Sequence, residues 1–129
     1  MKLSFEFHED DECSEIQHEN AELGKAYAML DMLDGDKYSH LSIERGDNRL
    51  MCINGGAELF VVIDNCEAGG ARPLINAAGR HEDITEVKIF GESQDVPEII
   101  VVGKPEARAA VQCFYEAAEG QLNWYEYET

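Results

Sequence analysis

The chain has 129 residues, the usual size of one domain, and 44% of them are hydrophobic, so it can bury a single core. It holds 27 Asp and Glu against 10 Lys and Arg, a formal net charge of -17. Such a charge repels DNA, RNA and anionic membrane surfaces, and it favours a basic protein partner. Acidity that serves solubility alone is the competing interpretation.

The N-terminal sequence MKLSFEFHEDDEC holds one Lys and an acidic run, and it lacks the continuous apolar core of a secretory signal. No stretch approaches the roughly 20 apolar residues that a membrane-spanning helix needs. The four cysteines have no close-pair spacing, and Cys52 and Cys113 lie in apolar contexts, so reduced thiols are expected. We therefore expect a cytoplasmic protein.

The first third of the chain predicts a strand, a loop and a helix. Apolar and polar side chains alternate over residues 3–8, which is typical of a half-buried strand. The run of four acids at 9–12 predicts a solvated loop. Residues 19–34 predict a helix capped by Asn20 and stopped by Gly35. Its apolar face holds Leu23, Tyr27, Leu30 and Leu33.

The middle of the chain predicts a three-stranded antiparallel meander. Apolar runs at 38–44, 49–54 and 58–64 are separated by turn residues and by glycines. The continuously apolar segment 60–63 predicts a central strand that is covered on both faces. Residues 65–73 are rich in glycine, and we expect a surface loop there.

The C-terminal half predicts two further strands, a helix and a final extended segment. Residues 84–90 alternate with charge on one face, and 99–102 form a short apolar run. Pro105 suits a first helical turn, and Gly120 is expected to end the helix. The aromatic segment 122–127 predicts a last strand or an extended segment on the sheet.

These elements alternate as strand, helix, several strands, helix and final strand. This order predicts an α+β fold in which two helices pack on a mainly antiparallel sheet. The sequence contains no internal repeat or linker, so we expect a single domain over residues 1–129.

No group of residues has the spacing of a catalytic or metal-binding motif. The segment from His8 to Cys13 lacks the alternate spacing and the Gly of a calcium loop, and it is short of a zinc set. No Cys lies in a nucleophile elbow or at a helix start. We therefore expect no enzyme, metal or cofactor. A small enzyme or ligand-binding domain that uses Cys66 and His81 in a loop-lined pocket is the alternative.

The segment from Trp124 to Glu128 alternates between its two faces. Trp124 and Glu126 share one face, and Tyr125 and Tyr127 share the other. We expect Trp124 to pack on the core. Tyrosine interleaved with acid is also typical of a surface that binds a cationic partner.

A pattern covers roughly the last 35 residues of the chain: a short strand, an Ala-rich helix with a Phe near its end, a Gly turn and a strand that ends in Trp. It is carried by Val96, Pro97, Val102, Pro105, Ala107, Ala110, Val111, Phe114, Tyr115, Glu116, Gly120, Leu122, Asn123 and Trp124. In this pattern the chain resembles the immunity proteins of bacterial polymorphic toxin systems, of the type encoded beside nucleic-acid deaminase toxins. The turn before Leu122 departs from the family because it lacks a Pro. The resemblance implies an antitoxin that binds and blocks a toxin without a cofactor.

Charge and resemblance lead to one hypothesis. A toxin that acts on nucleic acid has a basic substrate cleft, and an acidic protein can occupy that cleft. We expect a cytoplasmic immunity protein, monomeric or weakly dimeric, that occludes the active site of a cognate basic toxin. It would bind neither nucleic acid nor membrane. A housekeeping α+β protein is a third possibility, and it predicts negative charge spread evenly over the surface.

The expected contact residues lie on loops, because the strands and the helix face are needed for the core. The candidates are Asp10, Asp11 and Glu12 in the acidic run, Asp64 and Glu67 in the Gly-rich loop, and Tyr125 and Glu126 near the C-terminus. Carboxylates on loops can bind Arg or Lys in charge-assisted hydrogen bonds, and glycines let the backbone adapt to the partner.

Overall fold

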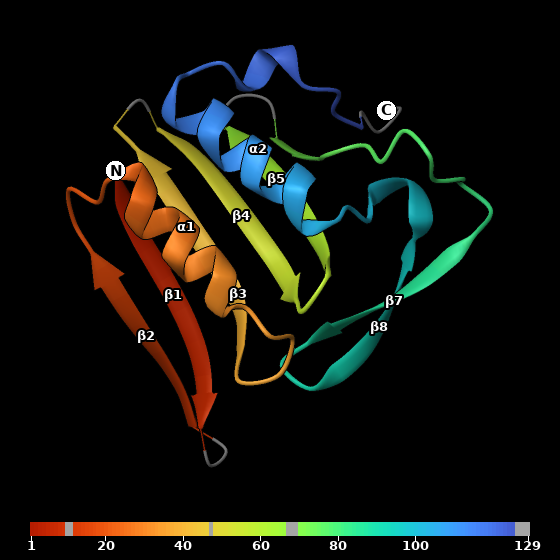
Figure 1. Cartoon of the computed structure of the whole chain (residues 1–129), viewed down its shortest axis with the longest axis horizontal. Coiled ribbons are helices and arrows are strands. Elements are labelled where there is room, and N and C mark those ends of the chain that lie inside the picture. Colours follow the sequence, from red (N-terminus) through yellow and green to blue (C-terminus); the bar gives the residue numbers. More distant parts are fainter. Residues whose placement is uncertain (10–11, 47, 67–69, 126–129) are drawn as a thin grey trace.

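The computed structural model describes residues 1–9, 12–46, 48–66 and 70–125, except for the side chain of Cys66. Within these residues the fold is α+β, as expected, with two helices and a mainly antiparallel sheet (Figure 1). The main sheet has the order β2-β1-β3-β4-β5-β6, and β7 and β8 form a separate two-stranded ribbon. The strands are β1 (Lys2–Glu9), β2 (Glu12–His18), β3 (Tyr38–Arg45), β4 (Arg49–Gly56), β5 (Leu59–Cys66), β6 (Gly70–Pro73), β7 (Ile84–Ile89) and β8 (Glu92–Pro97). The helices are α1 (Leu23–Met32) and α2 (Lys104–Tyr115).

The loop predicted over residues 9–12 is shorter than expected, because both of its end residues belong to strands. Glu9 ends β1 and Glu12 begins β2, and these strands pair in one antiparallel register from Leu3 opposite His18 to Glu9 opposite Glu12. Asp10 and Asp11 lie outside the described residues. The strand β2 was missed because six of its seven residues are exposed, so its sequence carries no alternation of apolar and polar side chains.

Helix α1 begins at Leu23, the first residue of its apolar face, and not at residue 19 as predicted, and the capping prediction is wrong. Glu22 occupies the N-cap without a side-chain hydrogen bond, and Asn20 lies before it with a φ of +53°. Gly35 has a φ of +78°, as a left-handed turn residue should, but it follows the helix end by three residues. The helix connects β2 to β3 across β1, which pairs with both strands.

The meander of β3, β4 and β5 is confirmed. Phe60 and Val62 are buried on one face of β5, and Val61 is buried on the other, so this strand is covered on both faces. The expectation of a loop over residues 65–73 is wrong at both ends. Strand β5 continues to Cys66, and β6 returns beside it over Gly70–Pro73.

The C-terminal half departs from expectation in two places. Residues 98–100 form a 3₁₀ turn in place of a strand, although Val102 pairs with Phe60 of β5. Helix α2 has Pro105 in its first turn, as expected, but it ends at Tyr115, before Gly120. The strand β7 alternates as expected, and its partner β8 was missed because its residues are polar and mostly exposed.

The core lies between one face of the main sheet and the two helices, which both cross the same face in Figure 1. Alternate strand residues face the helices, including Leu3 and Phe5 of β1 and Leu41 and Ile43 of β3. Their neighbours, such as Glu6 and His40, therefore lie on the opposite face. None of the helices in the described ranges has the length and apolar character needed to cross a membrane.

Candidate protein-interaction surface

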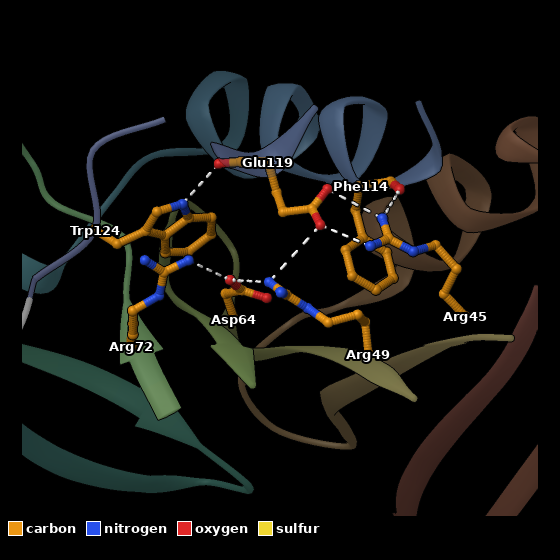
Figure 2. Close-up of polar contacts among 7 residues, drawn as sticks. All are labelled: Arg45, Arg49, Asp64, Arg72, Phe114, Glu119 and Trp124. Carbon is orange, nitrogen blue, oxygen red and sulfur yellow. Dashed lines mark hydrogen bonds and ion pairs between the residues drawn. The ribbon is translucent and has the colours of Figure 1, made fainter. Parts of the chain in front are cut away.

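Asp64 is not a surface carboxylate, which corrects its expected place in a loop. It lies in β5 on the helix-covered face and is 1% exposed. Arg49 Nη2 and Arg72 Nη2 donate to Asp64 Oδ2 over 2.6 and 2.7 Å (Figure 2). A buried carboxylate with two arginine partners has no surface to offer to another protein, so Asp64 serves the fold.

Glu119 is the second acid of this buried network and is 6% exposed. Arg45 donates to its two carboxylate oxygens over 2.7 and 3.0 Å, and to the Phe114 carbonyl oxygen over 2.7 Å. Arg49 Nη2 lies 3.7 Å from Glu119 Oε1, which links the two acids (Figure 2). The hydrogen bonds from Arg45 lower the pKa of the Glu119 carboxyl below its ordinary value, against the opposing effect of burial.

Strand register brings the three arginines of this network together. Arg45 is opposite Arg49 across β3 and β4, and Asp64 is opposite Arg72 across β5 and β6. All four side chains lie on the helix-covered face near one end of the sheet, beneath the segment that follows α2. Three of the five arginines in the sequence thus bind acids of the chain's own core. Seven Lys and Arg then remain in the sequence against 25 other Asp and Glu.

Trp124 packs on the core, as expected, and is 8% exposed. Its indole Nε1–H donates to the Glu119 carbonyl oxygen over 2.7 Å. Tyr125 is half-buried, and its ring centroid lies 5.5 Å from that of His81. These two rings line a cavity of about 120 Å³ with Pro97, Ile99 and Ile100. Tyr125 is therefore only partly accessible, and Glu126 lies outside the described residues.

The structure describes only one of the two side chains of the alternative site, that of His81. His81 lines the small cavity beside Tyr125, in the loop that precedes β7. Cys66 ends β5 opposite Gly70, and its side chain lies outside what the structure describes. A joint role for Cys66 and His81 stays a prediction. Glu67 also falls outside the described residues.

Strands β1 and β2 form an acidic hairpin, defined here by Glu6, Glu9, Glu12 and Glu15. Glu6 lies directly opposite Glu15, and Glu9 lies directly opposite Glu12. Like charges at directly opposed positions destabilise an antiparallel pair. Lys37 Nζ lies 3.7 Å from Glu9, but no Lys or Arg of the described residues forms an ion pair with the other three acids. The two glutamate pairs therefore place like charges at directly opposed positions, and the charges of Lys2 and His40 partly offset that of Glu15.

Hydrogen bonds keep part of the acidic hairpin ionised. Gln17 Nε2 donates to Glu15 Oε1 over 2.9 Å, and this bond, followed by one from Ser4, lowers the pKa of the Glu15 carboxyl. Of the three expected contact residues that the structure describes, Glu12, Asp64 and Tyr125, Glu12 is the one that is exposed. Glu6 and Glu15 were missed, although the strict alternation of 3–8 indicated that Glu6 points away from the core.

The row that contains Glu15 and Glu6 continues across the sheet to His40 and Asn54. His40 Nδ1 lies 2.6 Å from Asn54 Oδ1, and because this amide oxygen only accepts, Nδ1 carries the proton. His40 Nε2 lies 2.8 Å from Ser42 Oγ. These bonds hold the ring in place beside the acidic hairpin, on the face of the sheet away from the helices.

Comparisons with protein-family models, curated proteins and solved structures find no match to this chain. The case for a function therefore depends on the residues and on their geometry.

Proposed function

We propose that this chain is an immunity protein that binds a cognate toxin acting on nucleic acid and occludes its active site. The observation that carries the proposal is the acidic hairpin, where two pairs of glutamates face each other across the strands. Natural sequences break a local stability rule of this kind mostly at functional sites. A basic cleft would relieve the repulsion, and the relief would add to the free energy of binding.

The location of the cations supports the same proposal. Arg45, Arg49 and Arg72 are bound to Glu119 and Asp64 beneath the helix layer, so they do not screen the hairpin. A surface of one sign raises the rate of encounter with a partner of the opposite sign and rejects like-charged partners. The resemblance of the C-terminal third to immunity proteins agrees with this interpretation.

The first test is co-purification of the chain with the C-terminal domain of the toxin that this proposal expects to be encoded beside its gene. We expect a stable complex at micromolar concentration. If no complex forms, the proposed function is wrong.

The second test asks whether the acidic hairpin makes the contact. One variant carries Glu6→Gln, Glu12→Gln and Glu15→Gln. The matched control carries Glu86→Gln, Glu92→Gln and Asp95→Asn in the β7–β8 ribbon, where Glu86 also faces Asp95 and all three acids are exposed. Both variants remove three negative charges, so they differ only in where the charge is lost.

We expect the hairpin variant to associate with the toxin domain about tenfold more slowly at low ionic strength, and the control to change the rate much less. The difference should shrink at high salt, because salt screens exposed charges. Equal rates for the two variants would show that net charge matters and that the hairpin does not.

One observation favours a second candidate function, a small enzyme whose site differs from the Cys66 and His81 region of the alternative above. Ser42, His40 and Asn54 are connected in the order nucleophile, base and orienting group. A fluorophosphonate probe, which reacts with activated serines, distinguishes this alternative. Labelling of Ser42 that is lost in His40→Ala would support an enzyme, and an unlabelled protein that still binds the toxin domain would exclude a serine nucleophile here.

A further inference from the structure

The two edge strands of the main sheet, β6 and β2, differ in whether another segment of the chain pairs with them. Beyond β6 the C-terminal segment continues the pairing: Tyr125 N–H donates to the Pro73 carbonyl oxygen over 2.8 Å, and Ile75 N–H donates to the Asn123 carbonyl oxygen over 2.9 Å. On the other edge, β2 pairs with β1, and no other described segment bonds to it. Every second residue of β2 therefore directs its N–H and C=O away from the sheet.

The free edge of β2 lacks most of the features that protect edge strands. It runs for seven residues, longer than a typical strand of about 5–6, and it contains no proline. It pairs with β1 in one continuous register. Among the described residues, the only register shift in the pairing of β1 occurs with β3, between Glu6 and Phe7. In Figure 1 helix α1 lies over β1 and β3 and leaves β2 uncovered. Ile16 on the helix side of β2 is 39% exposed.

The negative charge of Glu15 and of the whole chain favours a basic strand at the free edge of β2. A second copy of the chain would bring another -17 to the contact, and a symmetric antiparallel pair centred on Glu15 would place the two copies of Glu15 opposite each other. A strand with Lys or Arg opposite Glu15 would instead extend the row that begins with Glu6 and relieve its repulsion. The edge is thus selective for a basic strand.

We propose that an extended segment of the toxin adds to β2 as a seventh strand of the main sheet. This inference rests on the proposed function and specifies how the contact is made. Main-chain hydrogen bonds supply the affinity, and side chains on alternate positions supply the specificity. The added strand carries a basic residue opposite Glu15 and, on the other face, an apolar residue opposite Ile16. The pair of Glu6 and Glu15, on the face away from the helices, then lies in one row with the basic residue of the bound segment.

Hydrogen exchange measures the added ladder directly. We expect the outward amides of β2 to exchange at least tenfold more slowly when the toxin domain encoded beside the gene is bound. The amides of β8, an exposed strand of the ribbon, serve as the internal control and should not change. A complex that forms without protection of β2 overturns this inference and leaves the proposed function intact. The absence of any complex overturns both.

Two proline variants test the same contact in a second way. Glu15 and Ile16 are adjacent, so their N–H groups point to opposite sides of β2, one to β1 and one to the free edge. Of Glu15→Pro and Ile16→Pro, one should therefore disrupt the β1–β2 ladder, and the other should leave it intact and remove an outward donor. Exchange of the β1 amides identifies which variant keeps the ladder.

We expect the variant that keeps its ladder to bind the toxin domain at least tenfold more weakly. Wild-type affinity in that variant would contradict strand addition. Protection of β2 in the chain alone, with the mass of a dimer in solution, would assign the edge to a second copy and would overturn the inference as well.

Discussion

The burial of Asp64 could not be predicted from its neighbours in the sequence. In the sequence it ends an apolar run before a Gly-rich segment, which is typical of an exposed acid. Its partners Arg49 and Arg72 lie 15 and 8 residues away in the chain, and only strand pairing brings them to it. Trp124 could be placed in the core from the sequence because its segment alternates between two faces and one of them was expected to pack on the sheet.

The first prediction concerns Asp64→Ala. The variant leaves Arg49 and Arg72 without their shared carboxylate in a partly buried site, so we expect the free energy of unfolding to fall by about 2–4 kcal/mol. Chemical denaturation measures this loss. Glu58→Ala, at an exposed acid between β4 and β5, is the control and should change little. A loss below about 0.5 kcal/mol for Asp64→Ala would show that the network contributes nothing to the fold.

The second prediction concerns pH and Glu119. Because the pKa of its carboxyl is lowered in the folded state, mainly by hydrogen bonds from Arg45, its stabilisation is complete above the ordinary value of 4.5. It is lost as the pH falls through the lowered pKa. We expect Glu119→Gln to be less stable than wild type at pH 7 and to lose less stability between pH 5 and pH 3. Unfolding curves over this range measure the difference, and parallel pH profiles would contradict it.

At the scale of elements, the sequence predicts those that have at least one buried face. The strands β3 and β4 and both helices have apolar periodicity, and β5 has a continuous apolar run that marks a strand covered on both faces; all five were found. The strands β2 and β8 are mostly exposed, so no buried face marked them. The four-residue β6 is defined by its pairing with β5, which its Gly-rich sequence does not indicate. Because β2 was not predicted, Glu15 was not named as a candidate contact, although the acidic run at 9–12 was.

The third prediction tests the tight contact between β4 and the turn after α1. A Cβ on Gly56 would collide with the backbone of Asp34 and Gly35, and no flexible side chain could move aside. We expect Gly56→Ala to lower the free energy of unfolding by more than about 2 kcal/mol. Gly24 in α1 has nothing within 4 Å of its added Cβ, so Gly24→Ala should be neutral or slightly stabilising. Equal thermal stability of the two variants would refute the close approach.

The fourth prediction separates stability from binding at the acidic hairpin. Glu15→Lys replaces a repulsive pair with Glu6 by an attractive one, so we expect a higher midpoint of thermal unfolding. The same change should slow association with the toxin domain, because it places a cation at the proposed contact. A variant that is more stable and also binds as fast as wild type would remove the hairpin from the interface.

At the scale of the whole molecule, the distribution of charge is the feature that unites fold and proposed function. Two acids and three arginines are used to fasten β3–β6 to the segment after α2. The other acids among the described residues lie largely on the surface, and four of them in β1 and β2 oppose one another in pairs. The net charge follows from composition, but the fold was needed to show that three arginines pair with buried acids while surface ion pairs of the described residues are few.

The most direct measurement of the central claim is the activity of the toxin domain on its nucleic-acid substrate as this chain is added. We expect activity to fall to background at about one equivalent of the chain. The hairpin variant with Glu6, Glu12 and Glu15 changed to Gln should need a higher concentration, and the matched variant of the β7–β8 ribbon should behave as wild type. Full toxin activity in the presence of excess chain would contradict the claim.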